Sequence, residues 1–237
     1  MNRRSAPRAR WGRPGAPKRK RTHKEGIASA LAFGVLAYGF DQACERFKAR
    51  GLKPQEALGD GAAHIATALA VAAPALPFVA DRRRFLAIAA LSAVAIDLDH
   101  VVAARSVELI SCMTMPHRPP SHSLLTLGAL TYLSERAWPG SQTELAIALG
   151  LGSHLLRDLA TGGAPIVLPR QIVEMARPSV AFMIVGLGAF GRWYARHMLD
   201  PRRPRRSNTT VLAPEGLMVA ARAVRALRAA RPTVVAA

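Results

Sequence analysis

Three sequences set carboxylates and imidazoles beside strongly apolar segments: AIDLDHV at residues 95–101, PHRPPSHSLL at 116–125 and SHLLRDLATGG at 153–163. Ionisable groups at the ends of apolar helices are costly unless they bind something. These sequences therefore predict helix ends that bind a metal ion at a membrane surface. The segments on either side of these three sequences can then be assigned by how they would place these helix ends.

Apolar segments suited to membrane-crossing helices, which need ~20 residues, lie on both sides of these sequences. Several are short, and 27–43 can be either a span or a helix lying in the interface. We expect an all-α fold, a multi-pass transmembrane helical bundle of about five to six spans. A soluble all-helical core protein is the alternative, because buried soluble helices can be apolar all round. The expected spans are 27–43, 62–80, 85–104, 122–138, 144–158 and 179–195.

The net charge of +18 lies almost wholly at the two ends of the chain, although half of all residues are apolar. Residues 1–24 hold ten Lys and Arg and no acid, and residues 197–237 hold eight Arg and two acids. Residues 25–196 are nearly neutral, with 15 basic and 13 acidic residues. We therefore expect a basic disordered N-terminal tail, a transmembrane helical domain that carries the metal site, and a basic C-terminal tail that can form an amphipathic helix. These regions are 1–26, 27–196 and 197–237.

Basic tails fit the anionic surface of a membrane and the positive charge of cytoplasmic loops, so membrane lipids are the expected partners. Nucleic acid is not expected, because Trp11 is the one aromatic residue of the N-terminal tail. With six spans, both tails and the basic turn at 81–84 fall on one side. This predicts cytoplasmic tails and a metal site on the opposite side. Cys44 and Cys112 form no CxxC pair, so the sequence indicates no thiolate zinc site or disulfide framework.

The candidate ligands are expected to meet at one end of the bundle. If the second to fifth apolar segments are antiparallel neighbours, the start of one helix and the end of the next lie on the same side. Asp97 and His100 share a helical face at spacing i, i+3, and His154 and Asp158 do so at i, i+4. Metal sites of helical bundles are built from such pairs. The expected metal ligands are His64, Asp97, His100, His122, His154 and Asp158.

Imidazole and carboxylate ligands suit a divalent ion. Zinc is the expected ion, with manganese and iron as alternatives. The ligands are more numerous than one tetrahedral ion needs, so either two ions bind or some residues orient the others. Asp99, His117 and Arg118 are expected to support catalysis, with Arg118 steadying an anionic group of the substrate. Gly162 and Gly163 are expected to form a backbone turn.

These motifs, in this order, resemble the signature of the bacterial membrane-bound metal-dependent hydrolases, the YdjM-like inner-membrane group. That family shows a DxDH motif, an HRxxTHS motif and an HxxxDxxT motif followed by glycine. The chain matches them with IDLDH at 96–100, HRPPSHS at 117–123 and HLLRDLAT at 154–161. Ile96 stands where the family usually has proline, and Ser121 replaces a threonine.

The resemblance covers about residues 62–170, and His64 corresponds to an early histidine of the family. It implies a multi-pass protein of the bacterial inner membrane that binds a divalent metal and acts as a hydrolase. Together with the residues, it favours a metal-dependent hydrolase at the membrane surface that acts on a lipid or phosphoester substrate. A metal or proton transporter and a non-catalytic membrane scaffold with a structural metal remain alternatives.

Overall fold

The computed structural model describes residues 23–199 except 116–117 and 166–170. Helices make up most of this part of the chain, which confirms the all-α prediction. Described helical structure runs from His23 to Leu199. The expected tails, apart from residues 23–26 and 197–199, lie outside the described residues.

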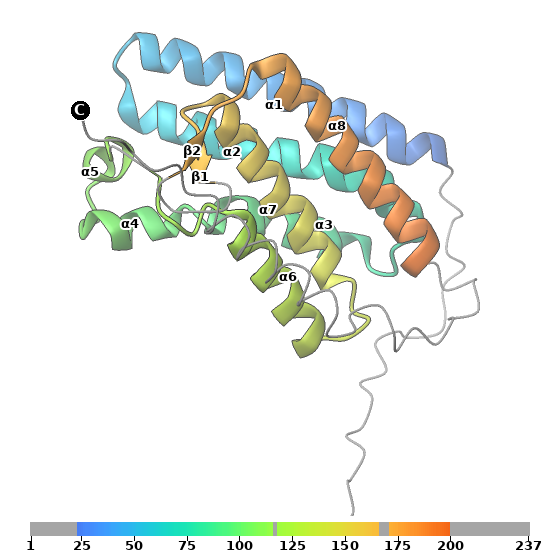
Figure 1. The fold of residues 1–237 in the computed structure, drawn as a ribbon. Helices are drawn as coiled ribbons and strands as arrows, with labels where there is room; N and C mark the ends of the chain where they lie inside the picture. The colour runs from blue at the N-terminus through green and yellow to red at the C-terminus, as the bar shows by residue number, and fades with distance from the viewer. Residues whose placement is uncertain (1–22, 116–117, 166–170, 200–237) are drawn as a thin grey trace, which may run out of the picture. The chain divides into compact units, whose positions relative to one another are not determined.

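Helix α7 (Thr143–Ala160) is the central element of the fold. It is apolar on nearly every side, and a helix of that kind is stable only when neighbours cover it. Four helices do so: α2 (Lys53–Ala72), α3 (Arg82–Ala95), α6 (Leu124–Ala137) and α8 (Arg177–Tyr194) (Figure 1). Leu149, Leu151 and His154 on α7 are almost fully buried. Helix α7 therefore places His154 and Asp158, the polar residues of the third motif, in the protein interior.

Gly150 allows the backbones of α3 and α7 to approach closely. A Cβ atom there would lie 2.1 Å from the Ala89 carbonyl oxygen and 2.2 Å from Ser92 Oγ. Membrane helices commonly use such small residues where their backbones meet. Since Asp97 follows α3 directly, this contact also sets how far Asp97 lies from the side chains of α7.

Helices α1 (His23–Ala49) and α2 pack against each other as a hairpin, with Gly51 at φ 69° in the connection. The predicted limits 27–43 and 62–80 were wrong, because the polar residues between them are largely helical. Hydropathy identifies only the part of a helix that suits lipid. A helix can extend beyond that part when the polar residues at its ends form hydrogen bonds or ion pairs with other residues. Asp41, for example, lies 3.1 Å from the buried Arg157 of α7.

The predicted span 85–104 is divided into two helices. Helix α2 runs on into a 3₁₀ turn, η1 (Ala73–Phe78), and Asp81 then caps α3 by accepting a hydrogen bond from the Arg84 backbone N–H at 3.0 Å. Helix α3 ends at Ala95, and α4 (Leu98–Ala104) begins after a turn. Asp97 lies in that turn and stays within 3.9 Å of His100, its predicted i, i+3 neighbour.

Short elements complete the described chain. They are α5 (Leu109–Met113), a two-residue antiparallel pair of β1 (Ala164–Pro165) with β2 (Ile172–Val173), and a π-helical turn η2 (Ala195–Leu199) after α8. The sequence did not predict the β pair. The predicted glycine turn precedes it and is confirmed, with φ 123° at Gly162 and 82° at Gly163.

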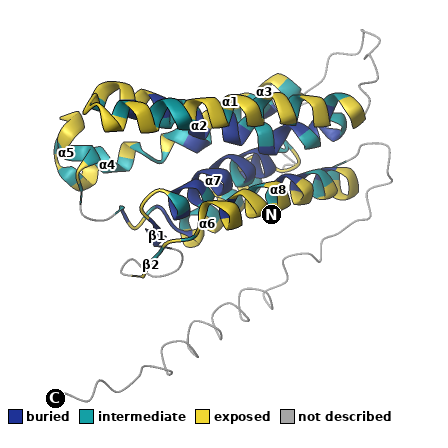
Figure 2. Cartoon of the chain, turned by 90° about the horizontal axis from the view of Figure 1, so that it is seen from above, coloured by how far each residue is buried: buried dark blue, intermediate teal, exposed yellow. Residues whose placement is uncertain are grey.

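Exposed residues lie along the outer faces of the helices, whereas α7 is mostly buried (Figure 2). Many of the exposed residues are large and apolar, while the polar residues His64, His122, His154 and Asp158 are buried. Val35 on α1, Val102 on α4 and Phe182 on α8 are each more than 70% exposed. Three helical segments are long and apolar enough to cross a membrane: His23–Ala49, Lys53–Phe78 and Arg82–Ala104. The described part of the chain therefore has apolar residues outside and polar residues inside, as membrane proteins do. The number of five to six spans stays a prediction.

Candidate metal centre

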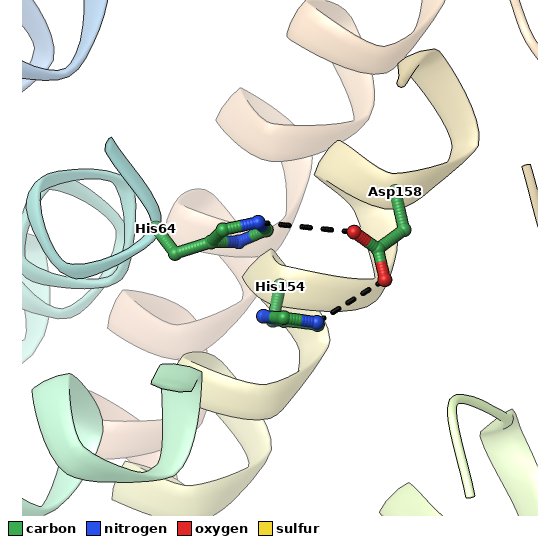
Figure 3. A group of neighbouring side chains, drawn as sticks. All are labelled: His64, His154 and Asp158. Atoms are coloured by element: carbon green, nitrogen blue, oxygen red, sulfur yellow. Dashed lines mark ion pairs between the residues drawn. The ribbon is translucent and has the colours of Figure 1, made fainter. Parts of the chain in front are cut away.

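One group of ligand atoms is completely buried between α2 and α7. His64 comes from α2, and His154 and Asp158 come from successive turns of α7 (Figure 3). Asp158 Oδ2 lies 3.1 Å from His154 Nε2, and Asp158 Oδ1 lies 3.8 Å from His64 Nε2. The two imidazole rings stack with their centroids 4.0 Å apart. One atom from each of the three residues lies within 4.8 Å of the other two, so the group can hold a metal ion.

A second group of three lies at the turn between α3 and α4. It consists of Asp97, His100 and His122, whose ligand atoms also lie within 4.8 Å of one another. Asp97 Oδ1 is 3.3 Å from His122 Nε2 and 3.9 Å from His100 Nδ1. His122 is fully buried and precedes α6, whereas Asp97 and His100 are partly exposed. This group can likewise hold a metal ion.

The two groups adjoin. Asp97 Oδ1 of the second group is 3.5 Å from His154 Nε2 of the first, and His122 Nε2 is 3.7 Å from Asp158 Oδ2. The chain therefore brings together all six predicted ligands in a single polar cluster. Carboxylate and imidazole alternate in it, which limits repulsion between like groups in the metal-free protein.

His154 has a fixed orientation. Its Nδ1 lies 2.6 Å from the Ala93 carbonyl oxygen on α3, and because a carbonyl can only accept, Nδ1 must donate. In the neutral ring Nε2 is then a free lone pair directed at Asp97 and Asp158, the arrangement found at metal-ligating histidines. His154 Nε2 and Asp158 Oδ2 are buried without a hydrogen bond among the described residues, while Asp158 Oδ1 forms an ion pair with Arg118 at 3.0 Å. Such buried groups are costly unless paired, so the residues present fit a divalent cation.

A comparison with protein families agrees with these motifs. The family model described as YdjM inner membrane protein matches residues 60–229. The chain belongs to the YdjM inner membrane protein family. The match covers well over half of the chain, includes every candidate ligand and leaves α1 outside it. No curated protein and no solved structure matches the chain.

His122 is the charged partner of two carboxylates in this YdjM family member. It lies in the loop before α6, with Nε2 3.3 Å from Asp97 Oδ1 and Nδ1 3.3 Å from Asp99 Oδ2. Burial by itself lowers the pKa of His122, but hydrogen bonds to Asp97 and Asp99 outweigh it and raise the pKa to about 9. The metal-free protein therefore carries an imidazolium here, and a metal ion ligated by His122 would displace its proton.

The three residues expected to support catalysis have different positions in the YdjM family protein. Asp99 contacts the outer side of the cluster, 3.2 Å from His100 Nδ1 and 3.3 Å from His122 Nδ1. Arg118 reaches Asp158 Oδ1 at 3.0 Å and donates to the Gly163 carbonyl at 3.0 Å, so it ties the loop before α6 to the end of α7. His117 lies outside the described residues.

Sequence reasoning missed two residues beside His64. Asp60 Oδ2 lies 3.6 Å from His64 Nε2, and Arg157 reaches Asp60 at 3.4 Å and Asp41 at 3.1 Å. The i, i+4 spacing of Asp60 and His64 was visible in the sequence, but the expected span began at residue 62 and left Asp60 out. The expected position of His64 near the start of a helix was also wrong, because α2 begins at Lys53.

Proposed function

We propose that this inner membrane protein is a metal-dependent hydrolase with two divalent ions, zinc being the preferred metal. His64, His154 and Asp158 would hold one ion, and Asp97, His100 and His122 would hold the other. Three protein ligands leave a coordination position open, as in catalytic rather than structural zinc sites. The observation that carries the proposal is the hydrogen bond from His154 to the Ala93 carbonyl, which leaves Nε2 free within a buried cluster of carboxylates.

The chain's own residues would prepare this centre for hydrolysis. Divalent ions bound there supply Lewis-acid polarisation of an ester or phosphoester oxygen and acidify a water molecule. Ala93 fixes the ring of His154, and Asp99 holds the Nδ1 side of His122. Arg118 lies at the edge of the cluster, where its side chain is 21% exposed. A guanidinium in that place can also orient an anionic substrate group.

Metal analysis of the purified protein tests this proposal. The wild type should retain about two ions per chain, as two three-ligand groups require. His64→Ala should lose one ion and His122→Ala the other, while His197→Ala, which changes an exposed histidine of η2, should lose neither. A wild-type protein that holds no metal after purification in metal-replete buffer would remove the basis for the hydrolase proposal.

A proton or metal transporter is the second candidate, and Glu144 is the observation that favours it. This buried acid lies at the start of α7, ten residues before His154 and thus about 15 Å along the helix. Leu145, Leu149 and Leu151, all buried, separate the two polar positions. Ion pathways need polar groups at successive depths, so the hydrolase is favoured. Zinc or proton flux into liposomes containing the protein, abolished by Glu144→Gln, would favour the transporter instead.

A further inference from the structure

A cavity of about 330 Å³ adjoins the candidate metal centre, and no role has yet been given to it. Ser92 and Ala95 of α3, Leu130 of α6, and Ile147 and Leu151 of α7 line it. Asp99, which contacts His100 and His122, lines it as well and so belongs to both the cavity and the cluster. The volume falls at the lower end of the range for ligand pockets, roughly 300–1,000 Å³.

The cavity runs from the cluster back along two helical segments. On α7, His154, Leu151 and Ile147 are spaced i, i−3 and i−7 and share one face. On α7 the cavity wall therefore extends about 6 Å, from Leu151 to Ile147, and its far end lies about 10 Å along the helix from His154. Ser92 precedes Asp99 by seven residues on the α3–α4 side, which gives a similar length. The cavity is thus elongated, with its polar end at the metal centre.

Apart from Asp99, Ser92 and Ser121, the lining is aliphatic and suits a hydrocarbon. Leu130, Ile147 and Leu151 are aliphatic, and the Ser92 hydroxyl already donates to the Ala89 carbonyl at 3.1 Å. Leu130 is 42% exposed on the outer face of α6, where the apolar surface of the protein begins. An apolar cavity that reaches such a surface offers an acyl chain a path from lipid, whereas water would find few partners there.

We propose that this cavity binds one acyl chain of a lipid substrate and thereby places an ester or phosphoester of that lipid at the metal centre. The inference rests on the proposed function and names its substrate class. Hydrolysis adds water across the ester or phosphoester bond, giving an alcohol and an acid, so no redox partner is required. The α7 face that carries His154 would align the chain with the reacting group.

Photo-crosslinking tests binding independently of catalysis. The full chain is reconstituted in vesicles of phosphatidylethanolamine and phosphatidylglycerol, with a phosphatidylglycerol whose acyl chain carries a diazirine. Because Leu151 is 1% exposed, an adduct there requires entry into the cavity rather than contact with the outer surface, and an adduct at the partly exposed Ile147 should accompany it on the same wall. The wild type should show such adducts, located by mass spectrometry. Labelling confined to exposed residues of α1, α6 and α8 would overturn the proposal.

Two variants that fill the cavity sharpen this test. Ala95→Phe and Leu130→Trp should each reduce the α7 adducts at least fivefold, and Leu130→Trp, on an exposed position, covers the case in which Ala95→Phe folds poorly. Ala87→Phe is the matched control, because it makes the same change at an exposed position of α3 outside the lining. The Ala87→Phe variant should form as many diazirine adducts on α7 as the wild type does. Undiminished α7 adducts in both folded cavity variants would contradict the proposal.

Chain-length dependence separates this inference from the proposed function. With soluble nitrophenyl esters and alkyl nitrophenyl phosphates, kcat/KM should rise about fourfold per methylene until the cavity is full. Ala95→Phe should flatten that rise. Hydrolysis without chain-length dependence would overturn the acyl-chain cavity and leave the hydrolase standing. Labelling of α7 without hydrolysis of any ester would overturn the hydrolase and leave the lipid site standing.

Discussion

At the scale of single residues, the backbone decides what the histidines can do. Ala93 occupies the Nδ1 side of His154 at 2.6 Å, so the other ring nitrogen must face the carboxylates. Among the described residues no backbone group does the same for His122, whose two nitrogens both face carboxylates instead. The backbone therefore fixes which nitrogen of His154 can bind a metal ion, whereas His122 must lose a proton before it can bind one.

That difference predicts a pH-dependent metal affinity. Because His122 has a pKa of about 9, the metal-free protein holds its proton over the neutral range and metal must compete with it. Zinc affinity should rise by about tenfold per pH unit for one displaced proton between pH 7 and 8.5, and level off above about 9. Titration against a competing chelator at several pH values measures this. Affinity that does not change over this range would contradict it, and His122→Ala should have the shallower slope.

Asp60 is predicted to position His64. Asp60→Asn removes the charge 3.6 Å from His64 Nε2, and removal of such orienting groups costs about 10–100-fold in metal affinity. Asp41→Asn is the control, because Asp41 pairs with Arg157 as Asp60 does but makes no contact with His64 among the described residues. Equal losses of zinc affinity in the two variants would show that Asp60 acts only through Arg157.

At the scale of elements, the sequence predicted which segments are helical better than where they end. The spacing of His154 and Asp158 on α7 and the order of the motifs were enough to predict the convergence of six ligands. The break at Ile96 and Asp97 was not predicted, because AIDLDHV has the hydropathy and helix propensity of a continuous helix. Asp60 was missed because the expected span began at residue 62 and left it out. Arg157 was missed because its partners Asp41 and Asp60 lie 116 and 97 residues away, and local patterns do not report such contacts.

The contact between α3 and α7 gives a prediction about packing. Gly150→Ala would place a methyl group 2.1 Å from the Ala89 carbonyl oxygen, so α3 must move, at a cost of about 1–3 kcal/mol. Gly128→Ala on α6 meets nothing within 4 Å and should instead stabilise the helix by about 0.5–1 kcal/mol. Thermal unfolding in detergent measures both. A stabilising effect of Gly150→Ala would show that the two backbones are not in contact.

At the scale of the whole molecule, apolar and charged residues are segregated in a way that fits a lipid environment. Within the described part, apolar side chains on α1, α4 and α8 are exposed, whereas His64, His122, His154 and Asp158 are fully buried. The excess positive charge lies instead near the two ends of the sequence. Exposed apolar area is costly in water but not in lipid, so this distribution is consistent with the inner membrane family of the chain.

The positive charges predict an orientation. The basic residues at 82–84 form the first turn of α3, and the candidate centre follows its other end, so the two ends of the Arg82–Ala104 segment should lie on opposite sides of the membrane. Positive residues remain cytoplasmic, which places Arg83 inside and Thr114 outside. The test uses a variant in which Cys44 and Cys112 are replaced by serine, and adds one cysteine at a time at Arg83 or Thr114, both of which are exposed. An impermeant thiol reagent should label Thr114→Cys in intact spheroplasts, and Arg83→Cys only after permeabilisation. The reverse pattern would put the metal centre on the cytoplasmic side, and labelling of both in intact spheroplasts would mean that this segment does not span.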